Sequence, residues 1–254
     1  MRGVIYLLLS LIFLSSCVSK KSITYFQNDK IDLSKASNSF KTVFKPDDLL
    51  EITILSENIE SVKPFNLPAA TFSAATNLVA GNPQQQRYLI NKNGEIDFPL
   101  IGKLKLGGLT REEAIKLLNI KLNPDYVKDP TINIRIANFK VTVLGDVQKP
   151  GTYTIPSERI TILEAIGLAG DLNISGQRNG ILVTREEGDE KKFYRVDLLS
   201  NKIFTSPVYY LQQNDVVYID QNKAKAQSAA TNQNTGLFVS IGSILISLIA
   251  VLTR

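Results

Sequence analysis

The feature that most constrains this chain is its single cysteine, Cys17, which follows an apolar stretch at the N-terminus. Arg2 provides the positive n-region of a signal peptide, and Val4 to Leu14 provides the apolar h-region. The string Leu14-Ser15-Ser16-Cys17 is typical of a bacterial lipobox, in which the thiol is acylated and the chain is cut before it. We expect residues 1–16 to be a lipoprotein signal peptide and Cys17 to be the lipid attachment site. An ordinary signal peptide with an incidental cysteine is the alternative.

Lipidation predicts where the chain resides. Each buried CH₂ of an acyl chain contributes about 0.8 kcal/mol, so several chains on one cysteine, palmitate among them, give a permanent anchor. Val18 follows the cysteine, in place of the aspartate that retains some lipoproteins at the inner membrane. We therefore expect a protein that is lipid-anchored at the cell outer membrane, with outer-membrane lipid as a partner and the bulk of the chain in the periplasm.

The absence of histidine and of a second cysteine excludes several classes of function. Removal of residues 1–16 leaves 238 residues, enough for one large or two small domains without an intrachain disulfide. A zinc site or a His-dependent catalytic triad is excluded, and we expect neither a metal nor a cofactor. The net charge of +5 comes from basic residues scattered among acids, so we expect no nucleic-acid partner.

A second apolar segment lies at the C-terminus. We expect residues 221–235 to be a polar linker and residues 236–254 to be a C-terminal transmembrane helix. The sixteen residues from Leu237 to Leu252 would span about 24 Å as a helix. This length is short for a typical bilayer core of about 30 Å, but it suits the thinner bacterial outer membrane.

Small and polar residues recur every three or four positions along this segment, within about 80° on one helix face. They are Asn232, Gly236, Ser240, Ser243, Ser247, Ala250 and Arg254. A stripe of this kind, here represented by Gly236, Ser240, Ser243 and Ser247, either packs against another helix or faces water. The segment alone slightly favours packing in a bundle. The alternative is one stave of an α-helical barrel whose serines line a wet lumen.

The first part of the periplasmic body is expected to hold strands and one helix. Strands are predicted at residues 49–55, 88–90, 96–100 and 131–136. Asn93-Gly94 predicts a hairpin that joins the second and third of these strands, and residues 60–87 predict a long loop or insertion. Thr110 and Glu113 form the capping box of a helix that Pro124 ends.

The second part of the body has the pattern of another α+β unit. Strands are predicted at residues 140–144, 152–155, 180–185, 192–197 and 215–220. Thr161 and Glu164 form a second capping box at the start of a short helix, and Gly170 is the expected C-cap at its end. Strand, turn, strand, helix and further strands within about 80 residues indicate a β-grasp fold.

Several strings in these two units resemble known families. The first unit is similar to the polysaccharide biosynthesis/export domain in Tyr88-Leu89-Ile90, Gly94-Glu95-Ile96, Pro99-Leu100-Ile101-Gly102 and Gly108 to Ala114. Its opening Pro46-Asp47-Asp48 resembles the family's Pro-Gly-Asp, with Asp47 in place of glycine. The second unit resembles the soluble-ligand-binding β-grasp (SLBB) repeat in Val141 to Val147, Pro150 to Tyr153, Leu163 to Ile166, Ala169 to Asp171 and Asn214 to Ile219. Asp171 stands where that family often has a second glycine.

The resemblance implies an outer-membrane lipoprotein of the Wza type, which exports capsular polysaccharide or exopolysaccharide through a pore of C-terminal helices. The implied fold is α+β, with a lipidated tether at residues 17–44, an export domain at 45–138 and one SLBB domain at 139–220, followed by the transmembrane helix. The implied partners are the translocated polysaccharide, further copies in a homo-oligomeric ring, and an inner-membrane chain-length regulator with its tyrosine kinase. This implied pore reverses the preference for simple helix packing.

Other functions compete with a channel. A lipid-anchored periplasmic module could bind glycan or peptidoglycan without forming a pore. An enzyme is not expected, because adjacent residues such as Glu112-Glu113 and Glu186-Glu187 do not form an acid/base couple by their spacing. Tyr209, Tyr210 and Tyr218 could stack on sugar rings, although packing in a core or an interface is the favoured interpretation.

Overall fold

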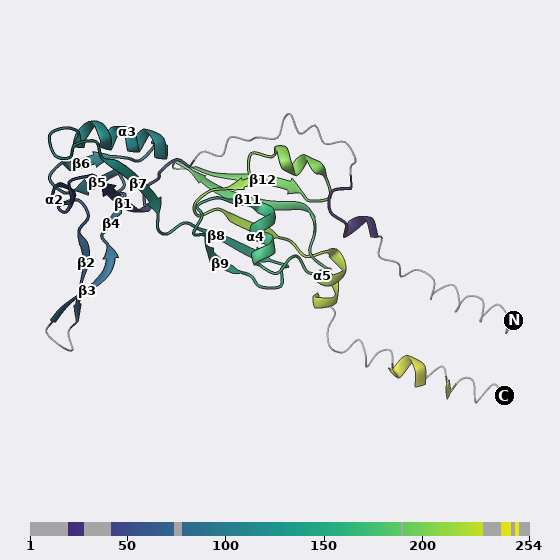
Figure 1. Cartoon of the computed structure of the whole chain (residues 1–254). Coiled ribbons are helices and arrows are strands. Elements are labelled where there is room, and N and C mark those ends of the chain that lie inside the picture. Colours follow the sequence, from purple (N-terminus) through teal and green to yellow (C-terminus); the bar gives the residue numbers. More distant parts are fainter. Residues whose placement is uncertain are drawn as a thin grey trace.

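The computed structural model describes residues 20–27, 42–73, 78–188, 190–230, 240–244 and 247–248. The expected signal peptide, Cys17 and Gly236 lie outside these residues, as do residues 231–235 of the expected linker and most of the expected C-terminal helix. Residues 223–230 of the expected linker are helical. Figure 1 shows two α+β domains side by side, with a β-hairpin that extends away from the first. Their buried apolar side chains form a single core cluster.

The first domain is built on a three-stranded antiparallel sheet in the order β4-β1-β7. Its strands are β1 (Leu49–Leu55), β4 (Arg87–Leu89) and β7 (Thr131–Ile136). Alternate residues of β1 and β7 are buried, so that Leu50 pairs with Ile136 and Ile52 with Ile134 on the core side. The helix α3 (Arg111–Leu122) covers the sheet, and the short helix α2 (Ile59–Val62) follows β1.

One prediction for the first domain is wrong, and another is made more specific. The strand at 88–90 pairs with β1 instead of with the strand after Asn93-Gly94, because the pairing of Tyr88 with Leu50 buries the tyrosine ring in the core. The chain turns at Asn91–Gly94, and β5 (Glu95–Phe98) then forms its own hairpin with β6 (Gly102–Lys105). The expected loop or insertion at 60–87 holds most of α2 and a hairpin of β2 (Pro68–Ser73) and β3 (Leu78–Gln85), so it is an insertion and not an irregular loop.

The second domain holds a five-stranded sheet in the order β12-β11-β14-β8-β9. Its strands are β8 (Lys140–Gly145), β9 (Gly151–Thr154), β11 (Asn179–Glu187), β12 (Glu190–Asp197) and β14 (Val216–Ile219). The central strands β14 and β8 are parallel, and the other pairs are antiparallel. Further elements are β10 (Ile160–Thr161), α4 (Ile162–Leu168), the 3-10 helix η3 (Asn201–Thr205) and β13 (Tyr210–Leu211).

Both predicted capping boxes are confirmed. The Thr110 hydroxyl accepts from the Glu113 amide while the Glu113 carboxylate accepts from the Thr110 amide, and Thr161 and Glu164 repeat the arrangement at α4. The helix α4 ends at Leu168, its C-cap is Ala169 and not the predicted Gly170, and Gly170 follows with a positive φ of 77°. The local helix signals were therefore sufficient to place both helices.

Short elements stand at each end of the described body. The 3-10 helix η1 (Lys20–Ser22) precedes it and α5 (Lys223–Ala230) follows it. Within the residues that the structure describes, no helix has the length and apolar character needed to cross a membrane. The α+β class and the order of the two domains agree with the sequence analysis, while the C-terminal transmembrane helix stays a prediction.

Candidate functional site

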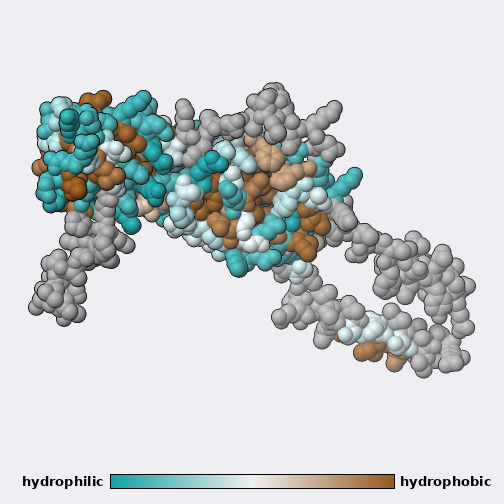
Figure 2. Space-filling model, in the orientation of Figure 1, coloured by the Kyte–Doolittle hydropathy of each residue, from teal (hydrophilic) through white to brown (hydrophobic). Residues whose placement is uncertain are grey.

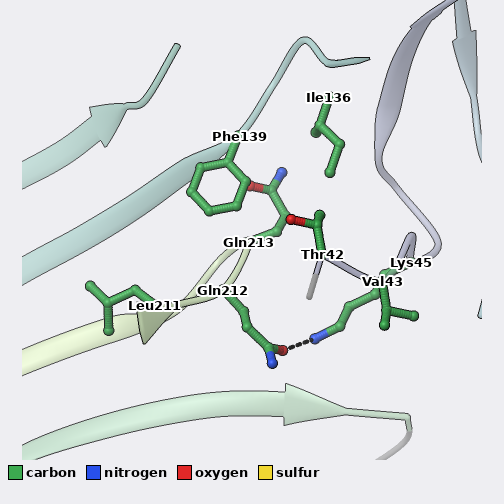
Figure 3. A pocket seen from close by; sticks show the side chains of 8 residues that line it. All are labelled: Thr42, Val43, Lys45, Ile136, Phe139, Leu211, Gln212 and Gln213. Atoms are coloured by element: carbon green, nitrogen blue, oxygen red, sulfur yellow. Dashed lines mark hydrogen bonds between the residues drawn. The ribbon is translucent and has the colours of Figure 1, made fainter. Parts of the chain in front are cut away.

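The two domains meet at a joint that begins at Lys45. The Lys45 ammonium donates to Gln212 Oε1 at 2.8 Å and to the Glu186 carbonyl oxygen at 3.1 Å, both in the second domain (Figure 3). Burial lowers the pKa of Lys45, although the charge of nearby Asp215 opposes the shift. Lys45 is thus a cation held between the domains rather than on a solvated surface.

The cavity at this joint is small. Its lining residues come from both domains and are Thr42, Val43, Lys45, Ile136, Phe139, Leu211, Gln212 and Gln213 (Figure 3). Its volume of about 20 Å³ is of the size that a water molecule occupies. The joint therefore holds the two domains together and is too small to accept a sugar ring.

Glu158 belongs to the second domain and binds the first, whereas Lys45 belongs to the first domain and binds the second. Glu158 precedes β10 and has a positive φ of 56°, yet its side chain is buried. Its Oε1 accepts from the Ile136 amide at 2.6 Å, and its Oε2 pairs with the Arg111 guanidinium at the start of α3. Both partners belong to the first domain, so a single carboxylate of the second domain bridges the end of β7 and the start of α3.

Asp48 is a second buried acid at the joint. Its Oδ2 accepts from the Lys45 amide at 2.8 Å, and its Oδ1 has no hydrogen-bond partner within the described chain. Burial raises the pKa of Asp48 to about 6, and the hydrogen bond and charge of Lys45 only partly oppose this shift. The protonation of this carboxyl group therefore changes near neutral pH.

A buried ion pair supports the loop that receives Lys45. Arg185 and Asp215 are almost fully buried and are joined by three hydrogen bonds, the shortest from Nη2 to Oδ2 at 2.7 Å. Asp215 Oδ2 also accepts from the Gln212 amide, while Gln213 donates to the Asn138 carbonyl and accepts from the Lys140 amide. The Gln212–Gln213 turn is thereby held in place at the domain boundary.

The N-terminal segment binds the second domain before the chain enters the first. The Tyr25 hydroxyl donates to Asp171 Oδ1 at 2.5 Å, and the Arg178 guanidinium lies 5.5 Å from the centre of the Tyr25 ring. The Phe26 amide donates to the Leu198 carbonyl at 3.1 Å. Burial and the interaction with Asp171 raise the pKa of Tyr25, so its hydroxyl remains a donor. We call residues 24–27 the N-terminal latch.

The C-terminal end of the body is tied to the same domain. The Lys225 ammonium of α5 donates to Asp146 Oδ1 at 2.6 Å, and Asn173 Nδ2 donates to the same oxygen. Burial raises the pKa of Asp146, but the hydrogen bonds from Lys225, Ser175 and Asn173 outweigh it and leave the pKa below its ordinary value. The last described helix of the body, α5, is therefore tied to the second domain.

The predicted stripe is only partly described. Gly236 lies outside the described residues, whereas Ser240, Ser243 and Ser247 are helical and exposed. Ser243 Oγ donates to the Ser240 carbonyl at 2.8 Å, and Ser247 Oγ donates to the Ser243 carbonyl at 2.9 Å. Their donors are thus satisfied within the helix. This arrangement is compatible with either a helix interface or a wet lumen.

The other candidate residues have structural roles. Glu113 caps α3, and Glu186 and Glu187 pair with Lys191 and Lys192 across the β11–β12 hairpin. Tyr209 packs against the core and meets the Tyr210 ring at 5.0 Å, while Tyr218 is apart from them on the outer face of β14. No cluster of three metal-ligating side chains occurs within the described residues.

The sequence analysis did not identify Lys45, Glu158 or the N-terminal latch. One signal was available for the latch, since Asp171 replaces a glycine that is usual in the resembled repeat. It has a positive φ of 73°, and its carboxylate accepts from Tyr25. Lys45 and Glu158 carry no local signal, because their partners are distant along the chain.

Comparisons with known proteins match both domains. The model of the polysaccharide biosynthesis/export protein family matches residues 36–137, and that of the SLBB domain matches residues 139–219. An "EPS I polysaccharide export outer membrane protein EpsA" from Ralstonia solanacearum is 32% identical over 110 residues, which cover 42% of this chain and 29% of that protein. The protein of the same name from Ralstonia nicotianae is 27% identical over 147 residues, which cover 56% of this chain and 38% of that protein.

The aligned segments thus span less than two fifths of the length of these curated relatives. The two domain matches follow each other in the order that the structure shows, and together they extend from residue 36 to residue 219. Residues 36–137 therefore form a domain of the polysaccharide biosynthesis/export protein family, and an SLBB domain follows it at residues 139–219.

Proposed function

We propose that this protein is the subunit of an oligomeric channel that exports capsular polysaccharide or exopolysaccharide across the outer membrane. The observation that carries the proposal is the tandem of export domain and SLBB domain over residues 36–219. The names of the relatives, which are polysaccharide export proteins of the outer membrane, support it. The chain acts as a passive conduit and not as an enzyme.

The joint between the domains supports this role. A channel wall needs subunits that keep one shape while a polymer passes. Lys45 and Glu158 tie the two domains by charged hydrogen bonds, of which the bond from the Ile136 amide to Glu158 is buried. Charge-assisted bonds of this kind are about twice as strong as neutral ones. The two domains therefore act as one rigid body in the wall of the channel.

The two ends of the body support an orientation. The N-terminal latch and α5 both attach to the second domain, away from the first (Figure 1). Cys17 precedes Thr24 by seven residues, a reach of at most about 25 Å. A lipid on Cys17 would thus hold the SLBB domain near the inner leaflet of the outer membrane, and the export domain would project into the periplasm.

The C-terminal segment completes the proposed channel. Residues 236–254 form a transmembrane helix, and Gly236, Ser240, Ser243 and Ser247 face the lumen or the neighbouring helix. A single helix encloses no pore, and exposed backbone is excluded from lipid, so the exit requires a ring of copies. The driving force comes from the inner membrane, where a chain-length regulator and its tyrosine kinase are the proposed partners.

Native mass spectrometry of the full-length lipoprotein in detergent tests the proposal. A chain that ends at Ala230 is the matched comparison, because it keeps α5 on the SLBB domain and lacks the proposed membrane helix. We expect a large, discrete ring for the full-length protein. A full-length chain that stays monomeric or dimeric across mild detergents would contradict the channel and favour an anchored glycan-binding module.

A further inference from the structure

An open groove lies on the second domain, between α5 and the loop that follows α4. Figure 1 shows α5 at the end of this domain that is farther from the first domain. The volume of the groove is about 610 Å³, within the range of about 300–1,000 Å³ that is usual for small-ligand sites. The residues that matter for its chemistry are Gln148, Leu172, Asn173, Ile174, Asn222 and Lys225. We call it the α5 groove, and unlike the cavity at the joint it has room for sugar rings.

The two walls of the α5 groove are joined by hydrogen bonds. The Asn222 amide donates to the Ser175 carbonyl at 2.8 Å, and the Asn173 amide donates to the Asp146 carbonyl at 3.1 Å. The ion pair of Lys225 with Asp146 ties α5 to the same part of the domain. The groove is therefore formed before any ligand arrives, and a ligand loses little affinity to the ordering of its walls.

The lining of the α5 groove is nearly neutral. Lys225 is the one charged residue among the described residues that line it. Its ammonium donates to Asp146 Oδ1 at 2.6 Å, and the Asp146 side chain is only 3% exposed. The positive charge is thus already paired with a carboxylate. The groove therefore suits an uncharged ligand better than an anion.

Three carboxamide groups in the lining keep hydrogen-bonding capacity for a ligand. Asn173 donates its Nδ2 to Asp146 and to the Val147 carbonyl, which leaves its Oδ1 as an acceptor. Asn222 uses its Oδ1 to accept from the Lys225 amide, which leaves its Nδ2 as a donor. The Gln148 side chain has no hydrogen-bond partner within the described chain. Donors and acceptors thus lie together along the groove.

An apolar surface lies beside these amides. Leu172 and Ile174 both line the groove, and Ile174 is 80% exposed. Figure 2 shows hydrophobic side chains (brown) beside weakly polar ones (pale) on the face of the second domain. A sugar ring has hydroxyl groups, which both donate and accept, and a face of C–H groups that is apolar. The α5 groove offers a partner to each of these parts.

We infer that the α5 groove binds an uncharged stretch of the exported polysaccharide. Sugar hydroxyl groups donate to Asn173 Oδ1 and accept from Asn222 Nδ2, and the C–H face of a ring lies on Ile174. The inference rests on the proposed export function and assigns to it a contact between the SLBB domain and its substrate.

Hydrogen–deuterium exchange of the full-length protein in detergent tests the site. The probe is a mixture of oligosaccharides made by partial hydrolysis of the surface polysaccharide of the producing strain. We expect exchange to slow at least twofold in peptides that cover residues 172–176 and 221–228. The protection should persist in about 0.5 M salt, because the contacts are uncharged. Protection elsewhere, none at all, or protection that salt abolishes would overturn the inference.

Two variants test the individual contacts by equilibrium dialysis of the labelled oligosaccharides. Asn222→Asp keeps the acceptor that caps α5 and removes the donor, so we expect about fivefold weaker binding. Ile174→Asp removes the apolar contact and should weaken binding about tenfold. Ile120→Asp is the matched control, because Ile120 is 76% exposed on α3 of the export domain, and it should change binding less than twofold. Equal effects of Ile174→Asp and Ile120→Asp would contradict the site.

The proposed function and the groove fail in different ways. Normal surface polysaccharide in a strain that lacks this protein would refute the export function. A strain that loses surface polysaccharide without the protein, while the purified protein leaves residues 172–176 and 221–228 unprotected by the oligosaccharides, would refute the groove alone.

Discussion

At the scale of single residues, the domain joint depends on buried charges whose surroundings differ. Glu158 has partners for both carboxylate oxygens, whereas Asp48 has a partner for one. Burial of a carboxylate with incomplete hydrogen bonding disfavours its charged form. The charged form of Asp48 therefore destabilises the folded protein at neutral pH, whereas Glu158 stabilises it.

We expect Asp48→Asn to stabilise the protein at pH 8 and to have little effect at pH 4. The pKa of Asp48 in the folded state is about 6, above its ordinary value of 3.8, so the wild-type carboxyl group stabilises the fold when protonated. This contribution is present below pH 4 and is lost as the pH rises through about 6, by up to about 3 kcal/mol. Thermal unfolding of both proteins between pH 4 and 8 measures it, and an equal difference at every pH would contradict the assignment.

We expect Glu158→Ala to lower the free energy of unfolding by about 3 kcal/mol, because it leaves Arg111 and the Ile136 amide without their shared partner. Calorimetry should also show the single transition broadening or splitting as the domains uncouple. Glu158→Gln keeps an acceptor for the Ile136 amide, so its free energy of unfolding should lie between those of the wild type and Glu158→Ala. Glu112→Ala removes an exposed acid from the same helix as a control, and a loss of the same size there would argue against the joint.

At the scale of elements, local signals placed the helices α3 and α4, while strand partners depended on the whole domain. The capping boxes at Thr110 and Thr161 act within four residues and were predicted from the chain alone. The Asn93-Gly94 turn was also identified, but the strand before it pairs with β1. Strand pairing follows from which apolar side chains can reach the core, and such contacts are not encoded within one hairpin.

The serine stripe makes a prediction for the C-terminal element. Replacing Ser240, Ser243 and Ser247 together by leucine should reduce surface polysaccharide at least tenfold while the protein level stays normal, because apolar side chains would close a wet lumen. Ile241→Leu changes a position outside the stripe, on the apolar side of the helix, and should leave export intact. Quantification of surface polysaccharide beside immunoblotting distinguishes the cases, and normal export in the triple variant would remove the stripe from the pore.

At the scale of the whole molecule, the described ends of the body converge on the SLBB domain. The N-terminal latch attaches to Asp171 and the Leu198–Leu199 backbone, and α5 attaches to Asp146. The proposed lipid anchor and the proposed membrane helix are thus connected to one rigid domain. The joint at Lys45 would then fix the position of the export domain relative to the membrane.

We expect Tyr25→Phe and Asp171→Gly each to speed tryptic cleavage after Lys21 about tenfold, since a hydrogen bond to a charged group contributes about 1.5–3 kcal/mol. The double variant should be cleaved no faster than either single variant, because both remove the same bond. Asp171→Gly also relieves the positive φ at this position, so its effect cannot come from backbone strain. Multiplicative effects of the two substitutions would show that Tyr25 and Asp171 act independently.

The amino-acid sequence by itself determined the α+β class, the order of the two domains, both helix caps and the family resemblance. Even its departures from the family pattern were informative, because Asp47 and Asp171 replace glycines and both have positive φ values. These features depend on hydrogen bonds and side-chain periodicity within a few residues of the chain. The tertiary structure alone decided the pairing of β4 with β1, the hairpin of β2 and β3, and the joint, in which Lys45 and Gln212 are 167 positions apart. Such contacts form when two domains exclude water from the same side chains, and no local pattern encodes which distant residue will lie opposite.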